Sequence, residues 1–521
     1  MIDPDTFHDL QEEVIYWAKE YMQENPLILA KTNYLEEIIN AIYNVVQHHW
    51  QEFGIFDSWS EEEALSFIRY HTKENTPKRY YARSSFSHNE FEDNDYESSC
   101  TNTNTPSSPN SHTQQESKFE TESQRSQPQH QSQHQIQKAQ QRVRELQEID
   151  KQNPKQGTKE WLNQRHNMIT ASSVSKLFNS QAQYQSIIKE KSAPNLRQEY
   201  EQDNTRGPAP LVWGHKYEPI SVQIYEDLTN ETVLSLGCIP HAQYPYLGAS
   251  PDGIISPFQE KEDSGKRAGR LLEIKNPISR TIDGVPSETY WIQQQIQMEV
   301  CDMDGCDFLE TQFKEMDEQA FYEPSSTNTV ANPPEEHPPT ISETETETHE
   351  EYLGVIAHYQ SYEWGDKYPK IKYLYLPPLT QFTSQPFLKL SHTNSDTNSD
   401  TISQSDSEPY SHTDVEPEAQ EAQEPQENVK AWMDTKTKQI VTDLKSHINQ
   451  QIPQTHPEYP NYTIMKKEYW KLTTLSLVYV PRNKEWFQAA QPIIQKAWET
   501  ILENRENHTQ LPYFIIEKQP N

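Results

Sequence analysis

Two carboxylates and a lysine lie in a part of the sequence that suits hydrolysis of phosphodiester bonds. Asp252 stands between Pro251 and Gly253, which predicts a turn that holds its carboxylate in place. Glu273 and Lys275 are two residues apart in an apolar run, so on a strand both side chains leave the same face. Carboxylates around an oxygen-seeking divalent ion can lower the pKa of a bound water and neutralise charge in an in-line displacement. The pattern therefore suits metal-dependent phosphodiester chemistry.

Each of these pieces is weak alone, because a Glu-x-Lys pair usually forms a solvated strand face and Asp before Gly is usually a turn residue. The elements that must position them strengthen the case. The segment Ser256 to Arg270 predicts a hairpin loop that brings Asp252 and Glu273 together. Glu218 lies near the expected start of a helix with an apolar stripe. We expect Glu218, Asp252 and Glu273 to converge within reach of one metal ion.

Helix-like and strand-like segments alternate from Arg142 to Phe321, which predicts an α/β or α+β domain. Two later ordered stretches, at 352–389 and 462–504, predict further strands and a helix of the same domain, so that one domain is split three ways. The chain is accordingly divided into a helical region (1–85), a linker rich in Ser, Gln and His (86–137), the domain core (138–321, 352–389 and 430–521) and two acidic insertions (322–351 and 390–429).

The first 85 residues carry helical patterns and no visible chemistry. Leu10, Val14 and Trp17 recur at helical spacing, and Ser60 followed by Glu63 predicts a capping box at the start of a later helix. The region is interpreted as a small helical interaction or scaffold domain.

The net charge of the chain is a weak guide to its binding partners, because the charge is unevenly distributed along the sequence. The chain has 521 residues and a net charge of −34, which argues against binding to nucleic acid. Most of the excess acid, however, lies in the linker and the two acidic insertions, whose compositions predict disorder. The N-terminus is acidic and no long apolar run is present, so we expect neither secretion nor a membrane-spanning segment. Four cysteines without CxxC spacing indicate neither a disulfide framework nor a structural zinc site.

Taken in order, these motifs resemble the PD-(D/E)XK nuclease superfamily. More closely, they resemble its lambda exonuclease and YqaJ viral recombinase branch, which includes nucleases of large DNA viruses. The segment from Trp161 to Ser172 is similar to the opening motif of that branch, and the segment from Tyr290 to Met298 is similar to its glutamine-bearing helix. The resemblance implies a restriction-endonuclease-like core, with a central mixed sheet flanked by helices.

The same resemblance assigns roles to single residues. It implies that Glu218, Asp252, Glu273 and the backbone carbonyl of Ile274 bind Mg²⁺, for which Mn²⁺ can substitute. It also implies that Lys275 is the catalytic lysine, which could orient the attacking water or stabilise its hydroxide form.

The flanking motifs receive roles on the same basis. Gln295 corresponds to the glutamine on the helix after the active-site strands, whereas Gln293 is the weaker candidate, because only one residue of that polar run need face the site. Arg165 and Ser172 correspond to the pocket for a terminal 5′-phosphate. Ser172 would also cap a helix that runs through Phe178, and a helix N-terminus with an added arginine binds phosphate well.

The function implied by the resemblance is a Mg²⁺-dependent exonuclease that degrades linear duplex DNA 5′ to 3′ from phosphorylated ends, in viral DNA recombination, repair or genome processing. A single-strand annealing protein is the implied partner. The phage enzyme's trimeric ring is left open here, because the helical region and the acidic insertions have no counterpart in it. The expected place is the cytoplasm or nucleus of an infected host cell, or the virion.

Two other readings stay open. One is a different PD-(D/E)XK nuclease, either an endonuclease or an iron–sulfur helicase-nuclease, although the cysteines are not placed for a cluster. The other is a non-catalytic DNA-binding or virion protein derived from a nuclease. Such relatives usually lose a metal ligand or the lysine, whereas all four residues are present here. Catalysis is therefore favoured.

Overall fold

The computed structural model describes the chain in ten ranges, and all structural statements refer to these. The ranges are 4–82, 133–156, 158–194, 208–258, 267–322, 350–361, 369–382, 388–390, 438–439 and 441–510. The greater part of the linker and of both acidic insertions lies outside them, so the predicted disorder of these segments stays a prediction. Helix α4 begins at Gln133, inside the segment expected to be linker.

The helical region forms a three-helix module, as predicted. Helices α1 (Pro4–Glu24), α2 (Tyr34–Glu52) and α3 (Glu61–Asn75) bury one apolar stripe each, with the short 3-10 turns η1 (Ile28–Ala30) and η2 (Ile55–Asp57) between them. The predicted capping box is present, since the Ser60 side chain accepts from the Glu63 backbone and the Glu63 side chain accepts in return. The chain then joins the main sheet through the short strand β1 (Tyr81–Ala82).

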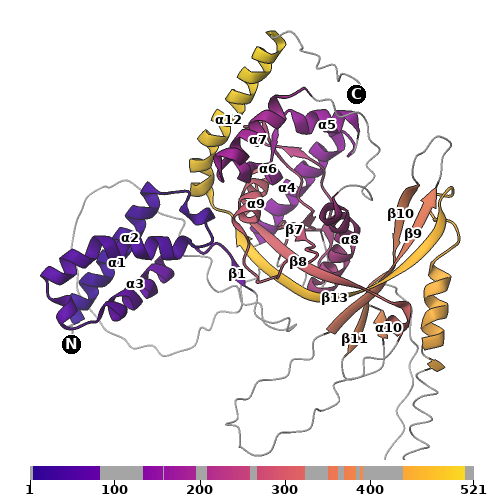
Figure 1. The fold of residues 1–521 in the computed structure, drawn as a ribbon, viewed down its shortest axis with the longest axis horizontal. Coiled ribbons are helices and arrows are strands. Elements are labelled where there is room, and N and C mark those ends of the chain that lie inside the picture. Colours follow the sequence, from indigo (N-terminus) through magenta and orange to yellow (C-terminus); the bar gives the residue numbers. More distant parts are fainter. Residues whose placement is uncertain are drawn as a thin grey trace, which may run out of the picture.

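A mixed sheet of ten strands forms the centre of the molecule (Figure 1). Eight of its strands follow the order β12-β11-β9-β13-β8-β7-β6-β3, while β1 pairs with β13 and β10 pairs with β9. Besides β1, the strands are β3 (Val233–Leu234), β6 (Gly253–Ile255), β7 (Leu271–Lys275), β8 (Gly305–Met316), β9 (Glu350–Ser361), β10 (Lys370–Tyr375), β11 (Leu379–Phe382), β12 (Leu388–Leu390) and β13 (Thr463–Pro481).

Strand β13 joins the three separated parts of the domain. It pairs antiparallel with β8 along one edge and with β9 along the other, although the three strands come from distant parts of the chain. Strands β7 and β8 are parallel, with Glu273 beside Phe308 and Lys275 beside Glu310, and helix α9 (Glu288–Cys301) connects them. The predicted α/β fold class is confirmed, and β13 pairs with strands from two other parts of the chain.

Helices α8 (Ala209–Thr229) and α9 cover opposite faces of this sheet. Tyr217 of α8 stacks on Phe313, whereas Tyr290 of α9 contacts Phe308, and residues of opposite parity on a strand point to opposite faces. The largest apolar cluster lies on the α9 face and takes in α12 (Lys484–Gln510) and residues of the three-helix module.

The remaining elements surround this core. A small second sheet has the order β2-β5-β4, from β2 (Ile169–Thr170), β4 (Ile239–Pro240) and β5 (Leu247–Ala249). The other helices are α4 (Gln133–Gln152), α5 (Lys159–His166), α6 (Ala171–Val174), η3 (Ser175–Leu177), α7 (Gln181–Ser192), α10 (Glu318–Tyr322) and a helix over 441–451. Among the described residues, none of the helices combines the length and the apolar character that a membrane span needs.

Candidate active site

The β6–β7 hairpin brings Asp252 and Glu273 together, as the sequence predicts. The two strands are antiparallel, with Gly253 opposite Leu272. Asp252 precedes β6, and its Oδ2 accepts a hydrogen bond of 2.7 Å from the backbone N–H of Ile274. The carboxylate is thereby fixed against the strand that carries Glu273.

Glu273 is fully buried, and both of its oxygens accept hydrogen bonds. Oε1 accepts from Lys275 Nζ and from Gln293 Nε2, the latter at 2.6 Å, and Oε2 accepts from Gln297 Nε2 at 2.7 Å. A buried carboxylate is costly unless such partners replace water. Three donors from one strand and one helix therefore fix the position of this group.

Lys275 is held as a cation. Burial alone would lower its pKa, but the neighbouring carboxylates of Glu273 and Asp252 outweigh burial and raise the pKa above the ordinary lysine value. The ammonium also lies 5.2 Å from the centre of the Tyr290 ring. At neutral pH this side chain therefore offers a positive charge and hydrogen-bond donors and does not serve as a base.

Asp252 has the opposite electrostatics. Burial raises its pKa well above the ordinary value, the nearby carboxylates of Glu273 and Glu218 raise it further, and Lys275 and the Ile274 N–H only partly oppose them. Three carboxylates therefore influence one another in this region. Such crowding is unfavourable unless positive charge offsets it.

Glu218 departs from two expectations. It lies near the middle of α8, next to Pro219, and not near the start of the helix. Its side chain is 41% exposed, and Oε2 lies 3.8 Å from His215 Nδ1. Within the described ranges, no three His, Cys, Asp or Glu side chains form a group that could hold a metal ion, so the expected convergence of Glu218 with Asp252 and Glu273 is not realised. Like charges repel, and among the three carboxylates Asp252 and Glu273 are each bound by their own donors.

The chemistry of the donor set nevertheless fits a divalent cation. Carboxylates and a backbone carbonyl are the ligands that Mg²⁺ prefers. Burial and then repulsion by the nearby carboxylates raise the pKa of Asp252, and a nearby cation would favour its ionised form. Asp252, Glu273 and the carbonyl of Ile274 are adjacent, and Glu218 is close enough to affect Asp252 electrostatically.

The glutamines that contact Glu273 are Gln293 and Gln297, and not the predicted Gln295. Gln295 faces away from Glu273: its Nε2 donates to the carbonyl of Pro481, and its Oε1 accepts from the N–H of Asn483. Gln293 and Gln297, which contact Glu273, are four residues apart and share one helix face, whereas Gln295 lies two residues from each, on the opposite side. The spacing of Gln293 and Gln297 was a signal available in the sequence.

Arg165 lies close to the same end of the sheet. Its Nη1 donates to Ser250 Oγ at 3.3 Å, and Ser250 is two residues from Asp252. The guanidinium also covers the ring of Trp161, with 4.9 Å to the ring centre. The structure therefore joins the opening motif to the Asp252 turn.

Ser172 does not cap a helix as expected. Thr170 occupies the N-cap position of α6 without a side-chain capping bond, and the helix spans only Ala171–Val174 before η3 follows. Ser172 is exposed, and its Oγ lies 3.3 Å from Thr170 Oγ1. The helix follows β2 directly and therefore starts two residues earlier than the sequence pattern predicted.

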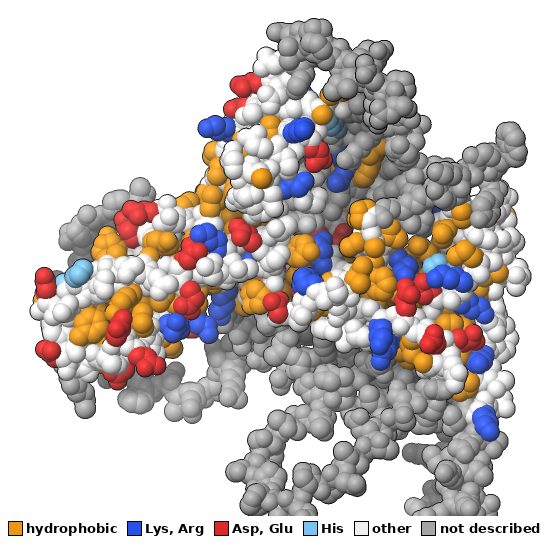
Figure 2. Space-filling view, viewed as in Figure 1, with side chains coloured by type: hydrophobic (Ala, Val, Ile, Leu, Met, Phe, Trp, Pro, Cys, Tyr) orange, Lys and Arg blue, Asp and Glu red, His pale blue; other side chains and the backbone are white. Residues whose placement is uncertain are grey.

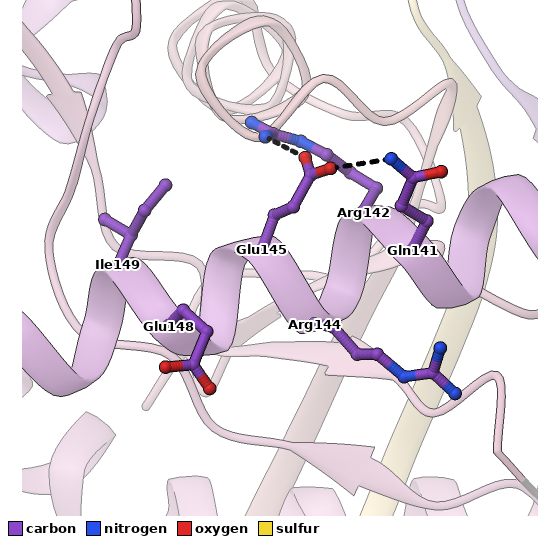
Figure 3. Close-up of a pocket in the computed structure, with 6 residues that line it drawn as sticks. All are labelled: Gln141, Arg142, Arg144, Glu145, Glu148 and Ile149. Carbon is purple, nitrogen blue, oxygen red and sulfur yellow. Dashed lines mark hydrogen bonds and ion pairs between the residues drawn. The ribbon is translucent and has the colours of Figure 1, made fainter.

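A hollow along α4 is a different feature of the surface (Figure 3). Glu145 accepts from both Arg142 and Gln141 on the same helix. Its lining contains none of the predicted site residues. On the face in Figure 2, the described basic side chains are interspersed with acidic and hydrophobic ones and are not gathered into one patch.

Comparison with known proteins finds a match over the part of the chain that holds this site. Residues 160–304 match the model of the YqaJ-like viral recombinase domain, and this range holds every residue described above as part of the site. This part of the chain is similar to the YqaJ-like viral recombinase domain. The resemblance predicted from the sequence motifs is thereby confirmed.

Other relatives cover more of the chain or have solved structures. An uncharacterised protein of Acanthamoeba polyphaga mimivirus is 26% identical over 376 residues, which make up 69% of this chain and 55% of that protein. The chain thus spans about half the length of the curated relative that it matches. Two structures of an alkaline exonuclease from Laribacter hongkongensis, one in complex with dAMP, are each 27% identical, with a TM-score of 0.24. They cover 30% and 31% of this chain, and 74% and 75% of their own chains are matched.

Proposed function

We propose that this protein is a metal-dependent nuclease that degrades linear duplex DNA 5′ to 3′ from phosphorylated ends. The observation that carries the proposal is the buried Glu273, hydrogen-bonded to Lys275 and placed beside Asp252 on one hairpin of the YqaJ-like domain. Such an arrangement suits phosphodiester hydrolysis, in which charge develops on the attacked phosphate.

The residues of the site have separate proposed roles. Asp252, Glu273, Glu218 and the Ile274 carbonyl would hold Mg²⁺, with Mn²⁺ as a substitute, and the bound ion supplies Lewis-acid charge and a more acidic water. The ammonium group of Lys275 would stabilise the negative charge of a scissile phosphate or of an attacking hydroxide. Gln293 and Gln297 keep the Glu273 carboxylate in one orientation.

The proposed preference for a phosphorylated end rests on Arg165. A guanidinium binds a terminal phosphate through several hydrogen bonds, and Arg165 lies one hydrogen bond from the loop that carries Asp252. The exposed Ser172 hydroxyl would add a donor to the same phosphate. An end bound there would enter the site in a single orientation.

The cellular role follows from the product. Removal of one strand from an end leaves a 3′ single strand, and a single-strand annealing protein is the partner that would use it in viral recombination or repair. The mimivirus relative fits an infected cell as the setting. A homo-oligomer, which by analogy with the phage enzyme would be a trimer, is the state that a measurement of molecular mass in solution would test.

The decisive experiment is digestion of linear duplex DNA that carries a 5′-phosphate or a 5′-hydroxyl, labelled at each end in turn, with Mg²⁺, Mn²⁺ or EDTA. We expect metal-dependent loss from the phosphorylated 5′ end and a loss of activity of at least about 10²-fold in Lys275→Ala. Lys314→Ala is the matched control, because Lys314 is exposed on the neighbouring strand β8. Circular dichroism would show that both variants fold.

Three results would contradict the proposal. Cutting of closed circular DNA would favour an endonuclease. DNA binding without cleavage at any metal concentration would favour a non-catalytic DNA-binding protein. Full activity in Lys275→Ala would remove the proposed role of the lysine.

A further inference from the structure

A buried arginine connects the three-helix module to the helix that holds Glu273. Arg79 is only 3% exposed, and its Nη2 donates to the carbonyls of Ala30 and Pro286, each at 3.1 Å. Ala30 belongs to the module, whereas Pro286 lies just before α9. One guanidinium group thus bridges two parts of the chain that are far apart in sequence.

The contact continues on the backbone side of the same residue. The indole Nε1 of Trp291 donates to the carbonyl of Arg79 at 3.0 Å, and the guanidinium lies 5.5 Å from the centre of that indole ring. Two residues later, Tyr81 and Ala82 pair with Tyr479 and Val478 of β13. The module is therefore attached to both the sheet and the first turn of α9, beside which it lies in Figure 1.

A charge in this position needs its hydrogen bonds. Burial lowers the pKa of Arg79 to about 10, so the group stays charged at neutral pH in a poorly solvated place. Its acceptors are backbone carbonyls with fixed positions. Loss of either carbonyl would leave a buried donor unsatisfied, which makes the relative position of the two segments energetically defined.

The first turns of α9 also carry the contacts to the site. Tyr290, next to Trp291, lies beside the Lys275 ammonium. Gln293 and Gln297 follow on the same helix and donate to Glu273. A shift of the start of α9 would therefore move the groups that orient the proposed catalytic carboxylate and lysine.

We propose that Arg79 is a positioning residue, through which the N-terminal module sets the place of α9 and hence the orientation of Glu273 and Lys275. This inference rests on the proposed nuclease function for its catalytic consequence. It assigns the module a role within the active enzyme, in place of a separate scaffold domain.

The test compares Arg79→Met, Arg79→Lys and Arg69→Met in the full chain. Arg69 is the matched control, since it lies on α3 of the same module with its side chain 53% exposed and paired to Glu36. We expect kcat to fall about tenfold in Arg79→Met with KM changed less than twofold, because substrate binding is intact while the catalytic groups are displaced. Arg79→Lys should recover part of the rate, and Arg69→Met should behave as wild type.

A double-mutant cycle separates positioning from loss of stability. If Arg79 acts through α9, then Arg79→Met and Gln297→Leu should be non-additive in kcat, measured on folded protein well below the unfolding temperature. Additive effects, or a loss of rate that merely follows the folded fraction, would overturn the proposal.

A second measurement does not depend on activity. Hydrogen exchange of the α9 amides over 288–297 should be faster in Arg79→Met than in wild type and in Arg69→Met. Unchanged exchange there would overturn the positioning role even if the enzyme is active. If wild type cuts no DNA, the nuclease proposal fails, and exchange alone then decides whether Arg79 fixes α9.

Discussion

At Glu273, one carboxylate receives hydrogen bonds from two strand-facing glutamines and from a lysine on its own strand. Groups that orient a catalytic or metal-binding side chain through hydrogen bonds typically change activity by ten- to a hundredfold when removed. The glutamines on α9 therefore differ in function according to the face they occupy.

Gln297→Leu and Gln295→Leu make this difference measurable. Gln297→Leu removes the bond to Glu273 Oε2, so we expect kcat per folded molecule to fall about tenfold. Gln295→Leu breaks the contacts to Pro481 and Asn483, so we expect a lower melting temperature and an unchanged kcat per folded molecule. The opposite pattern in kinetics and thermal unfolding would restore Gln295 to the site.

The raised pKa of Asp252 has a consequence for stability. In the unfolded chain Asp252 ionises at its ordinary pKa, whereas the folded protein retains this proton to higher pH. The folded state thus binds more protons, and the free energy of unfolding falls as pH rises from the ordinary value through the raised one. Asp252→Asn removes the charge and should, in EDTA at pH 7.5, melt a few degrees above wild type.

Addition of Mg²⁺ tests the metal site in the same assay. Wild type should melt at a higher temperature with Mg²⁺, since a ligand that binds only the folded state stabilises it. Asp252→Asn should respond less. Asp57→Asn, at an exposed carboxylate of the helical module, should behave as wild type. If neither Mg²⁺ nor Mn²⁺ changed the melting temperature of the wild type, a carboxylate metal site would be contradicted.

At the scale of elements, close strand packing holds the split domain together. Gly354 of β9 lies under Trp470 of β13, and a Cβ built on Gly354 would lie 2.3 Å from the indole Cζ2. Because the indole is buried and cannot move freely, only glycine fits at this position.

Gly354→Ala should lower the free energy of unfolding by about 1–3 kcal/mol, because the added methyl group forces β9 and β13 apart. Gly214→Ala is the matched control: outside the adjacent residues and the backbone of its own helix, no atom lies within 4 Å of its added Cβ. Alanine in a helix should raise stability by about 0.5–1 kcal/mol. Urea unfolding measures both. A neutral effect of Gly354→Ala would mean that the β9–β13 contact is loose.

At the scale of the whole molecule, a buried charge cluster joins three parts of the chain. Glu468 of β13 accepts from Lys216 Nζ of α8 at 2.6 Å, and His358 Nε2 of β9 lies 3.2 Å from its other oxygen. Burial opposes ionisation of Glu468, but the bonds to His358 and Lys216 outweigh it and lower its pKa. The stabilisation is present above the ordinary carboxyl pKa and is lost as pH falls through the lowered value.

Lys216→Met should lower the free energy of unfolding by about 3–5 kcal/mol, since it leaves a buried carboxylate without its main cation. The double variant Lys216→Met, Glu468→Leu should recover most of this loss and should lose less stability than wild type below about pH 4, where carboxylates take up protons. Lys466→Met is the control, because Lys466 also contacts Glu468 but is half exposed. Equal stability of all four proteins across pH would exclude a structural role for the cluster.

The sequence by itself determined the features that depend on near neighbours. The turn at Asp252, the shared face of Glu273 and Lys275, the hairpin between them and the Ser60 capping box follow from local backbone geometry, and all are present in the structure. The family resemblance follows from the same short motifs, since their order and residue types are properties of the chain alone.

Only the tertiary structure decided which face of α9 contacts Glu273 and which way the Glu218 side chain points. It also decided that Thr170, and not Ser172, occupies the N-cap position of α6. It also decided that Arg79 connects the helical module to α9. These features depend on packing between segments that are far apart in sequence. That packing determines the rotation of a helix, the separation of carboxylates and the burial of a charge. Periodicity along one segment shows which residues share a face, such as Gln293 and Gln297, but not which partner that face meets.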